Sequence, residues 1–248
     1  MELLEVEGLC KKYSQFTLKD VSFSIGAGEI MGLIGKNGAG KSTTLKSILN
    51  MVRPDQGKIL MNGREFQRFE AECKQEIGVV FGGIDFYKYK KLSDITAVTR
   101  LFYRNWDDIA YQRYMQMFEL DPKKRVNQLS SGMKVKYLIT IALSHNAKLL
   151  ILDEPTSGLD PVARDDLLEL FLQLVKNGSR SILFSTHITS DLDKCASSIT
   201  YIKNGEILKT AEKEDFIKYF QYLKRPDETG DLNLEEIMIR TERKTYHV

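Results

Sequence analysis

The sequence predicts an α/β protein with a mainly parallel sheet that is covered by helices. Three short runs are almost continuously apolar, at 29–35 (EIMGLIG), 148–155 (KLLILDEP) and 181–187 (SILFSTH), and segments with helical spacing lie between them. Such strands are typical of parallel sheets, because helices bury both faces of the sheet. Ligands bind at the carboxyl ends of the strands in these sheets, so we expect the functional side chains directly after each run.

The N-terminal part of the chain predicts a small antiparallel sheet beside the first buried strand and a helix. Apolar residues alternate at Leu4, Val6, Leu9, Leu18, Val21, Phe23 and Ile25. This alternation is typical of strands with one buried face. The segment KSTTLKSILNM, at 41–51, has apolar residues at helical spacing, and we expect Pro54 and Gly57 to stop this helix. The segment GKILMNG, at 57–63, predicts one more short strand.

The middle of the chain predicts an α-helical subdomain inserted into the sheet domain, at about 83–147. Residues 92–120 are rich in aromatic side chains and have helical spacing, and Asp121–Pro122 interrupts the pattern. A further helix is expected directly after the stretch QLSSGM, at 128–133. This insertion would lie on one side of the parallel sheet.

The last third of the chain predicts a long helix and then a change of composition. The segment PVARDDLLELFLQLVKNG, at 161–178, predicts a helix that is opened by Pro161 and closed by Gly178. We assign 1–224 to the main domain. The remaining residues, 225–248, are polar and mixed in charge, so we expect them to form a loosely attached C-terminal extension.

Composition excludes several classes of protein. Hydrophobic residues make up 42% and charged residues 28% of the 248 residues, which is an ordinary globular balance, and the net charge of +2 gives no strong basic footprint for nucleic acid. Cys10, Cys73 and Cys195 lie far apart, which argues against a disulfide framework or a zinc site and suits a reducing compartment. We expect neither a signal peptide nor a spanning helix, because no apolar run approaches ~20 residues.

A glycine-rich loop between the first buried strand and its helix predicts a phosphate site. GKNGAGKST fits the pattern G-x-x-x-x-G-K-[ST] in full. Glycines let backbone N–H groups point inward, and these groups and the positive helix end bind β- and γ-phosphate oxygens. Lys41 adds a charge there, and Ser42 offers a hydroxyl to Mg²⁺. The expected nucleotide-binding residues of the loop are Gly35, Lys36, Asn37, Gly38, Ala39, Gly40, Lys41, Ser42 and Thr43.

Acidic and imidazole side chains follow the next two buried runs. Asp153 ends one strand and is expected to hold Mg²⁺ together with Ser42. Glu154 is expected to polarise a water molecule against the γ-phosphate. His187 ends the neighbouring strand and is expected to contact the γ-phosphate and to hold the geometry of that water. An apolar strand that ends in Asp-Glu is ordinary by itself, and the complete phosphate loop upstream favours the catalytic interpretation.

The stretch QLSSGMKVK, at 128–136, contains no carboxylate, histidine or cysteine and yet has the pattern of a helix start. Serine hydroxyls and free backbone amides at a helix N-terminus bind anions, helped by the helix dipole. A plain helix cap is the alternative interpretation.

The ordered set GKNGAGKST, LSSGM, LLILDE, SGLD and STH resembles the nucleotide-binding subunits of ABC (ATP-binding cassette) transporters. The resemblance covers about 2–212, and LSSGM is a variant of the signature pentapeptide of the family. It implies the P-loop NTPase fold of ABC ATPases, with a mainly parallel core sheet, an antiparallel β subdomain and the helical subdomain. It also implies an ATPase with ATP and Mg²⁺ as cofactors.

The resemblance implies a second anion site that serves another subunit. In the family, two chains close head to tail around two nucleotides, as a homodimer or a heterodimer, and the signature contacts the ATP that the partner holds. The residues of this chain at those positions are Ser130, Ser131, Gly132 and Met133. The segment SGLD, with Ser157, Gly158, Leu159 and Asp160, would lie across the interface and couple the two sites. An aromatic residue at the position of Tyr13 stacks on adenine in the family, for which a π-face suffices.

One position departs from the family pattern. Many members carry a glutamine after the strand that corresponds to EIGVVF, at 76–81, where it contacts Mg²⁺ and links the ATP site to the membrane partner. The matching position here is Gly82, which has no side chain to ligate a metal. Asp85 or a water molecule is the candidate substitute.

The separate chain, LSSGM and the segment DPKKRVNQ, at 121–128, resemble the ATPases of bacterial exporters of peptides, toxins or drugs, in which the membrane permease is a second chain. This implies a cytoplasmic protein that sits peripherally on the inner face of the membrane. The segment YKYKKL, at 87–92, interleaves aromatics with lysines, and we weigh three interpretations: a solvated face, a contact with the permease near anionic headgroups, and a nucleic-acid surface.

Two rival functions remain at this point. A soluble ATPase of the same superfamily that acts on ribosomes or DNA is disfavoured by the single cassette and by the short interval between the phosphate loop and LSSGM, which lacks sustained heptads. We therefore expect no nucleic-acid partner. A nucleotide-gated regulator without turnover is disfavoured because Glu154 and His187 are both present.

Overall fold

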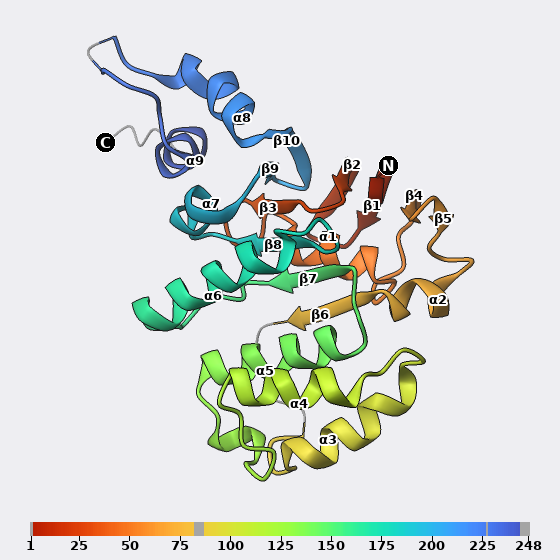
Figure 1. Ribbon diagram of the computed structural model, residues 1–248. Helices are drawn as coiled ribbons and strands as arrows, with labels where there is room; N and C mark the ends of the chain where they lie inside the picture. Colours follow the sequence, from red (N-terminus) through yellow and green to blue (C-terminus); the bar gives the residue numbers. More distant parts are fainter. Residues whose placement is uncertain (1, 82–86, 227, 244–248) are drawn as a thin grey trace.

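The computed structural model describes residues 2–81, 87–226 and 228–243, and it confirms the predicted α/β architecture (Figure 1). Five strands of the main sheet are parallel neighbours, and a sixth pairs antiparallel at one edge. In sheet order these strands are β10 (Glu206–Glu212), β9 (Ser198–Lys203), β3 (Ile30–Ile34), β8 (Ser181–Thr186), β7 (Leu149–Asp153) and β6 (Ile77–Phe81).

A second, antiparallel sheet forms the predicted β subdomain. In sheet order its strands are β2 (Thr17–Gly26), β1 (Glu2–Lys12), β4 (Gln56–Met61) and β5 (Arg64–Glu65). The helices, including the 3-10 turns η1 to η3, are α1 (Lys41–Ile48), α2 (Glu70–Gln75), α3 (Leu92–Thr99), η1 (Arg100–Phe102), α4 (Asp108–Met117), η2 (Val126–Gln128), α5 (Ser131–Ser144), α6 (Pro161–Val175), α7 (Thr189–Cys195), α8 (Lys213–Tyr219), η3 (Phe220–Leu223) and α9 (Leu234–Glu242).

Both faces of the parallel sheet are buried, which explains why its strands are continuously apolar. Along β7, Leu149 and Ile151 pack with α1 and the antiparallel sheet, while Leu150 and Leu152 pack with α5 and α6. Helix α1 therefore lies between the two sheets. This double burial fixes the ends of the parallel strands, where the predicted functional residues follow.

Helices α3, α4 and α5 form the helical subdomain at one end of the molecule (Figure 1). This subdomain has a small core of its own that includes Leu92, Met115 and Tyr137. Helix α5 belongs to two cores, because Tyr137 packs in the subdomain while Ile139 packs against the sheet. The predicted helical region at 92–120 is interrupted after η1. A new helix, α4, follows, and its N-cap Asp107 accepts hydrogen bonds from the backbone amides of Ile109 and Ala110.

The helix after the phosphate loop ends earlier than Pro54. Helix α1 stops at Ile48, and Asn50 adopts a left-handed conformation with φ 54°. The backbone amides of Met51 and Val52 then both donate to the carbonyl of Lys46. This local cap ends the helix, so the proline is not the cause.

The expectation of a loosely attached C-terminal extension is wrong for the part that the structure describes. Leu232, Leu234 and Ile237 are at most 3% exposed and belong to the main core, and in Figure 1 α9 lies beside α7. Arg240 also donates to both carboxylate oxygens of Glu228, which lowers the pKa of Glu228 to about 2. The polar composition hid a narrow apolar stripe, which is sufficient to dock a short helix.

Among the described residues, no helix combines the length and the apolar character that crossing a bilayer requires.

This packing predicts that α9 stabilises the whole domain. Ile237→Ala is expected to lower the free energy of unfolding by about 2–5 kcal/mol, because it leaves a cavity in the main core. Ile239→Ala on the same helix, where the side chain is 53% exposed, should change it by no more than ~0.5 kcal/mol. Urea unfolding measures both values, and equal small effects would show that α9 is not part of the core.

Candidate active site

The glycine-rich loop joins β3 to α1, and its backbone geometry requires glycine at two positions that matter for the site. Gly35 has φ 152°, and a Cβ there would lie 2.3 Å from the carbonyl oxygen of Ile202. Gly40 caps α1 with φ 119°, and a Cβ would lie 2.9 Å from the ring of Phe16. The loop is thus packed closely on β9 and on the residues before β2, and it presents the free amides at the start of α1.

A hollow of about 490 Å³ opens over this loop. Its lining contains most of the predicted phosphate-binding residues together with Glu154, and it also contains two residues that the sequence did not single out. The lining residues are Gln15, Phe16, Lys36, Asn37, Gly38, Gly40, Lys41, Ser42, Thr43 and Glu154. No sequence pattern marks Phe16, because its position depends on the turn between β1 and β2.

Tyr13 lies close to this hollow along the chain, but the aromatic side chain that lines the hollow is Phe16. The backbone amide of Tyr13 donates to the carbonyl of Phe16 at 2.7 Å, and the Tyr13 ring is 42% exposed. The stacking of Tyr13 on adenine therefore stays a prediction, and Phe16 is the aromatic side chain at the hollow itself.

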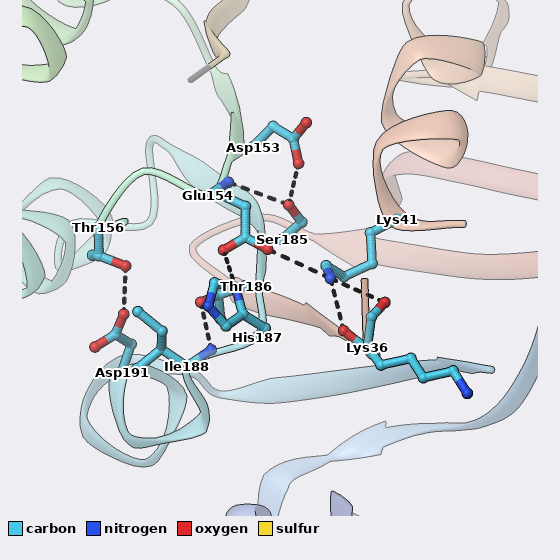
Figure 2. Close-up of polar contacts among 11 residues, drawn as sticks. Lys36, Lys41, Asp153, Glu154, Thr156, Ser185, Thr186, His187, Ile188 and Asp191 are labelled. Carbon is cyan, nitrogen blue, oxygen red and sulfur yellow. Dashed lines mark hydrogen bonds and ion pairs between the residues drawn. The ribbon is translucent and has the colours of Figure 1, made fainter. Parts of the chain in front are cut away.

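Lys41, Glu154 and His187 form a continuous chain of contacts, as Figure 2 shows. The buried ammonium of Lys41 donates to the carbonyl of Gly35 at 2.7 Å and lies 3.4 Å from Glu154 Oε1. The other carboxylate oxygen, Oε2, is 2.8 Å from His187 Nδ1. Because an ionised carboxylate only accepts, Nδ1 carries the hydrogen in this pair. Glu154 also adopts a left-handed backbone with φ 51°, a conformation that is uncommon for a residue other than glycine.

Asp153 is held by the neighbouring strand. The hydroxyl of Ser185 donates to Asp153 Oδ1, and the backbone amide of Glu154 donates to the carbonyl of Ser185 at 3.0 Å. Asp153 and Ser185 are direct partners in the register of β7 and β8. These bonds fix the direction of the carboxylate at the end of β7.

Metal binding at this site has to rely on few protein ligands. The described ranges contain no group of three or more His, Cys, Asp or Glu side chains that could hold a metal ion by themselves. Ser42 and Asp153 supply a hydroxyl and a carboxylate oxygen, which are ligands that Mg²⁺ accepts when phosphates and water complete its shell. The donor set therefore fits a magnesium ion that arrives with a nucleotide.

A buried ionic network joins the segments that follow two of the predicted catalytic residues, Glu154 and His187. Asp191 is fully buried on α7, four residues after His187, and it accepts a hydrogen bond of 2.6 Å from the hydroxyl of Thr156. Arg164 of α6 donates to the other carboxylate oxygen of Asp191. The network ties together the segments that follow Glu154 and His187 and the start of α6. Neither Thr156 nor Asp191 carries a pattern that predicts this pairing.

The LSSGM stretch starts α5, as predicted. Ser130 is the N-cap, and its hydroxyl accepts from the amide of Met133 at 3.2 Å. Its hydrogen can still be donated to an anion. Ser130 and Ser131 are exposed, and neither they nor Gly132 and Met133 line the hollow over the phosphate loop.

The SGLD segment lies beside the start of α5. A Cβ on Gly132 would meet the side chains of Leu159 and Ala163 at 3.6 and 3.7 Å. Ser157 and Gly158 are exposed, and the Asp160 carboxylate caps α6 by accepting from two backbone amides. Gly82 and Asp85 lie outside the described residues.

Comparisons with known proteins agree with this geometry. The family described as ABC transporter matches residues 18–157. The ABC transporter ATP-binding protein YtrB of Bacillus subtilis (strain 168) is 34% identical over 208 residues, which cover 81% of this chain and 70% of YtrB. The lantibiotic transport ATP-binding protein SrtF of Streptococcus pyogenes is 35% identical over 217 residues, which cover 86% of this chain and 91% of SrtF.

Solved structures show the same fold. An ATP-binding subunit of an ABC transporter superposes with a TM-score of 0.83 at 29% identity, and the match covers 97% of this chain and 100% of that one. A nucleotide-free ATP-binding cassette from an ABC transporter has the same fold, with a TM-score of 0.77 at 23% identity. The match covers 91% of this chain and 96% of that one.

A phosphate loop, a paired glutamate and histidine at strand ends, and these relatives define an ATP-binding ATPase domain. This chain belongs to the ABC transporter family. It is the ATP-binding, ATP-hydrolysing subunit of an ABC transporter, and such subunits work with transmembrane permease components.

The buried network makes a prediction for Thr156. Thr156→Val removes the hydroxyl that donates to Asp191 and is expected to lower the free energy of unfolding by about 1–3 kcal/mol, because a buried carboxylate oxygen loses a partner. Thr156→Ser keeps the donor and should retain most of the stability. Denaturant unfolding of both variants measures the difference, and a Val variant as stable as the Ser variant would contradict the role of the bond.

Proposed function

We propose that this chain drives export of a peptide, toxin or drug and that two copies, or one copy and a close relative, close around two MgATP. The observation that carries the proposal is the pairing of Lys41, Glu154 and His187 at the hollow over Gly35–Thr43. An intact hydrolytic set at a phosphate loop favours turnover over simple nucleotide sensing.

ATP binding is proposed at the phosphate loop. The amides at the start of α1 and the ammonium of Lys41 bind the β- and γ-phosphates, with Tyr13 against the adenine. The loop residues in contact are Gly35, Lys36, Asn37, Gly38, Ala39, Gly40, Lys41, Ser42 and Thr43. Ser42 and Asp153 hold Mg²⁺, which neutralises phosphate charge when bound.

Hydrolysis follows from an exchange of partners at Glu154. The triphosphate competes with Glu154 for the ammonium of Lys41, because both are anions within reach of the same cation. A displaced Glu154 keeps His187 as a partner and has one carboxylate oxygen to accept a proton from water. His187 and Lys41 stabilise the charge that develops on the γ-phosphate.

The dimer is proposed because the second anion site, at the start of α5, lies outside the hollow over the phosphate loop. Ser130, Ser131, Gly132 and Met133 start a long helix and do not line the hollow of their own chain. A partner chain can bring this helix N-terminus to the γ-phosphate. Leu159 lies close enough that a Cβ on Gly132 would contact it, and this proximity couples the helix start to the SGLD segment, Ser157–Asp160.

A groove on the helical subdomain supports a permease contact on the inner face of the membrane. A hollow of about 260 Å³ is lined by Tyr87, Lys90, Asp94, Ile95, Val98 and Thr99. Leu101 and Phe102 are 78% and 71% exposed directly after it. An apolar strip of this kind is typical of a protein interface, and we assign the YKYKKL segment, which borders it, to the same contact.

Export is proposed because of the transport functions for which two relatives are named. SrtF is described as a lantibiotic transport protein and BcrA of Bacillus licheniformis, 30% identical over 210 residues, as a bacitracin transport protein. A soluble ATPase that acts on ribosomes or DNA is the alternative, and co-purification with a membrane protein or with ribosomes separates the two.

The role of Glu154 predicts a separation of binding from turnover. Glu154→Gln is expected to bind MgATP at least as tightly as the wild-type protein, because the competing carboxylate at Lys41 is gone. It should hydrolyse MgATP about 10²–10⁴-fold more slowly and accumulate as an ATP-bound dimer. Phosphate release and nucleotide titration measure the two properties. Glu214→Gln, an exposed change on α8, is the charge control. Wild-type turnover in the Glu154 variant would show that another group activates the water.

A further inference from the structure

The last described helix reaches the phosphate loop. Glu242, at the end of α9, places Oε2 3.2 Å from Nζ of Lys36, the second residue of the loop. The side chain of Glu242 is only 13% exposed, whereas that of Lys36 is 47% exposed. Oε2 is buried without a hydrogen-bond partner among the described residues, so Lys36 is the charge that offsets it.

The position of Glu242 is fixed by β9. The hydroxyl of Tyr201 donates to Glu242 Oε1 at 3.1 Å, and the ammonium of Lys203 donates to the carbonyl of Thr241 at 2.7 Å. Burial raises the pKa of Tyr201, and the nearby carboxylate raises it further. The same strand contacts the loop, because Ile202 lies against Gly35. The carboxylate therefore has a defined place beside the loop.

Lys36 borders the hollow proposed for the triphosphate, but its ammonium is directed away from Lys41 (Figure 2). A lysine at this rim attracts phosphate by simple Coulomb interaction, and the attraction falls when a carboxylate neutralises the lysine. The pair thus sets how much positive charge the loop presents to a nucleotide.

We propose that Glu242 is a positioning residue that acts through Lys36: it holds this ammonium out of the phosphate site and thereby weakens nucleotide binding. The inference rests on the proposed phosphate site at Gly35–Thr43. It gives α9, beyond the residues 18–157 that match the family, a direct part in nucleotide affinity. By thermodynamic linkage, a nucleotide that draws Lys36 toward its phosphates loosens the end of α9.

The test is a titration of MgADP and of MgATP into wild-type protein and a set of variants, by calorimetry at low and at high salt. Glu242→Gln keeps the shape of the side chain and an oxygen that accepts from Tyr201. It is expected to bind both nucleotides about 2- to 10-fold more tightly at low salt, with a smaller gain at high salt. Glu235→Gln, an exposed change on the same helix, controls for net charge and should bind as wild type does.

A double variant isolates the pair. In a Lys36→Met background, Glu242→Gln is expected to have no effect, because the ammonium that it releases is gone. Unchanged or weaker binding in Glu242→Gln, an equal gain in Glu235→Gln, or a gain that persists without Lys36 would each overturn the inference. If wild-type protein and Lys41→Ala bind MgADP equally well, the proposed phosphate site itself is wrong. This outcome is distinct from a failure of the Glu242–Lys36 inference alone.

Discussion

The proposed nucleotide site and the proposed dimer both depend on where two helices begin. The N-terminus of α1 lies in the hollow over the phosphate loop, and the N-terminus of α5 lies exposed outside it. Each start carries backbone amides that have no partner within the helix and that favour an anion. Helix α5 is packed in two cores at once, through Tyr137 and Ile139, so it is held firmly in place. One chain therefore has two helix starts that favour an anion, and only the start of α1 lines the hollow. The proposed dimer would use both.

Glu154 connects this arrangement to chemistry. Its carboxylate lies between the ammonium of Lys41 and the imidazole of His187, which come from the loop after β3 and the end of β8. Because β3, β8 and β7 are adjacent parallel strands, the phosphate loop, Glu154 and His187 lie at the same edge of the sheet. The Thr156–Asp191 bond joins the segments that follow Glu154 and His187.

The sequence predicted the parts of the site that follow from local pattern. The strand before Gly35, the strand that ends at Asp153 and the cap at Ser130 are each marked by a continuous run or a motif, and the structure confirms those strands and that cap. It could not predict contacts between distant segments, such as Lys36 with Glu242 or the presence of Phe16 at the hollow, because no periodicity encodes them. The error at α9 has a similar cause: two or three buried side chains in a polar segment give a weak signal, although they dock the helix firmly.

The most direct test asks whether two chains share each ATP site. The Glu154→Gln variant receives a second substitution at the start of a helix, and sedimentation in MgATP measures its mass. Ser131→Glu suits its own helix dipole but would place a carboxylate against the γ-phosphate of a partner. Ser93→Glu makes the same change at the exposed start of α3 and serves as the matched control. We expect a dimer with the Ser93 change and a monomer with the Ser131 change. A dimer that forms equally well in both would contradict the claim that one chain completes the other's site.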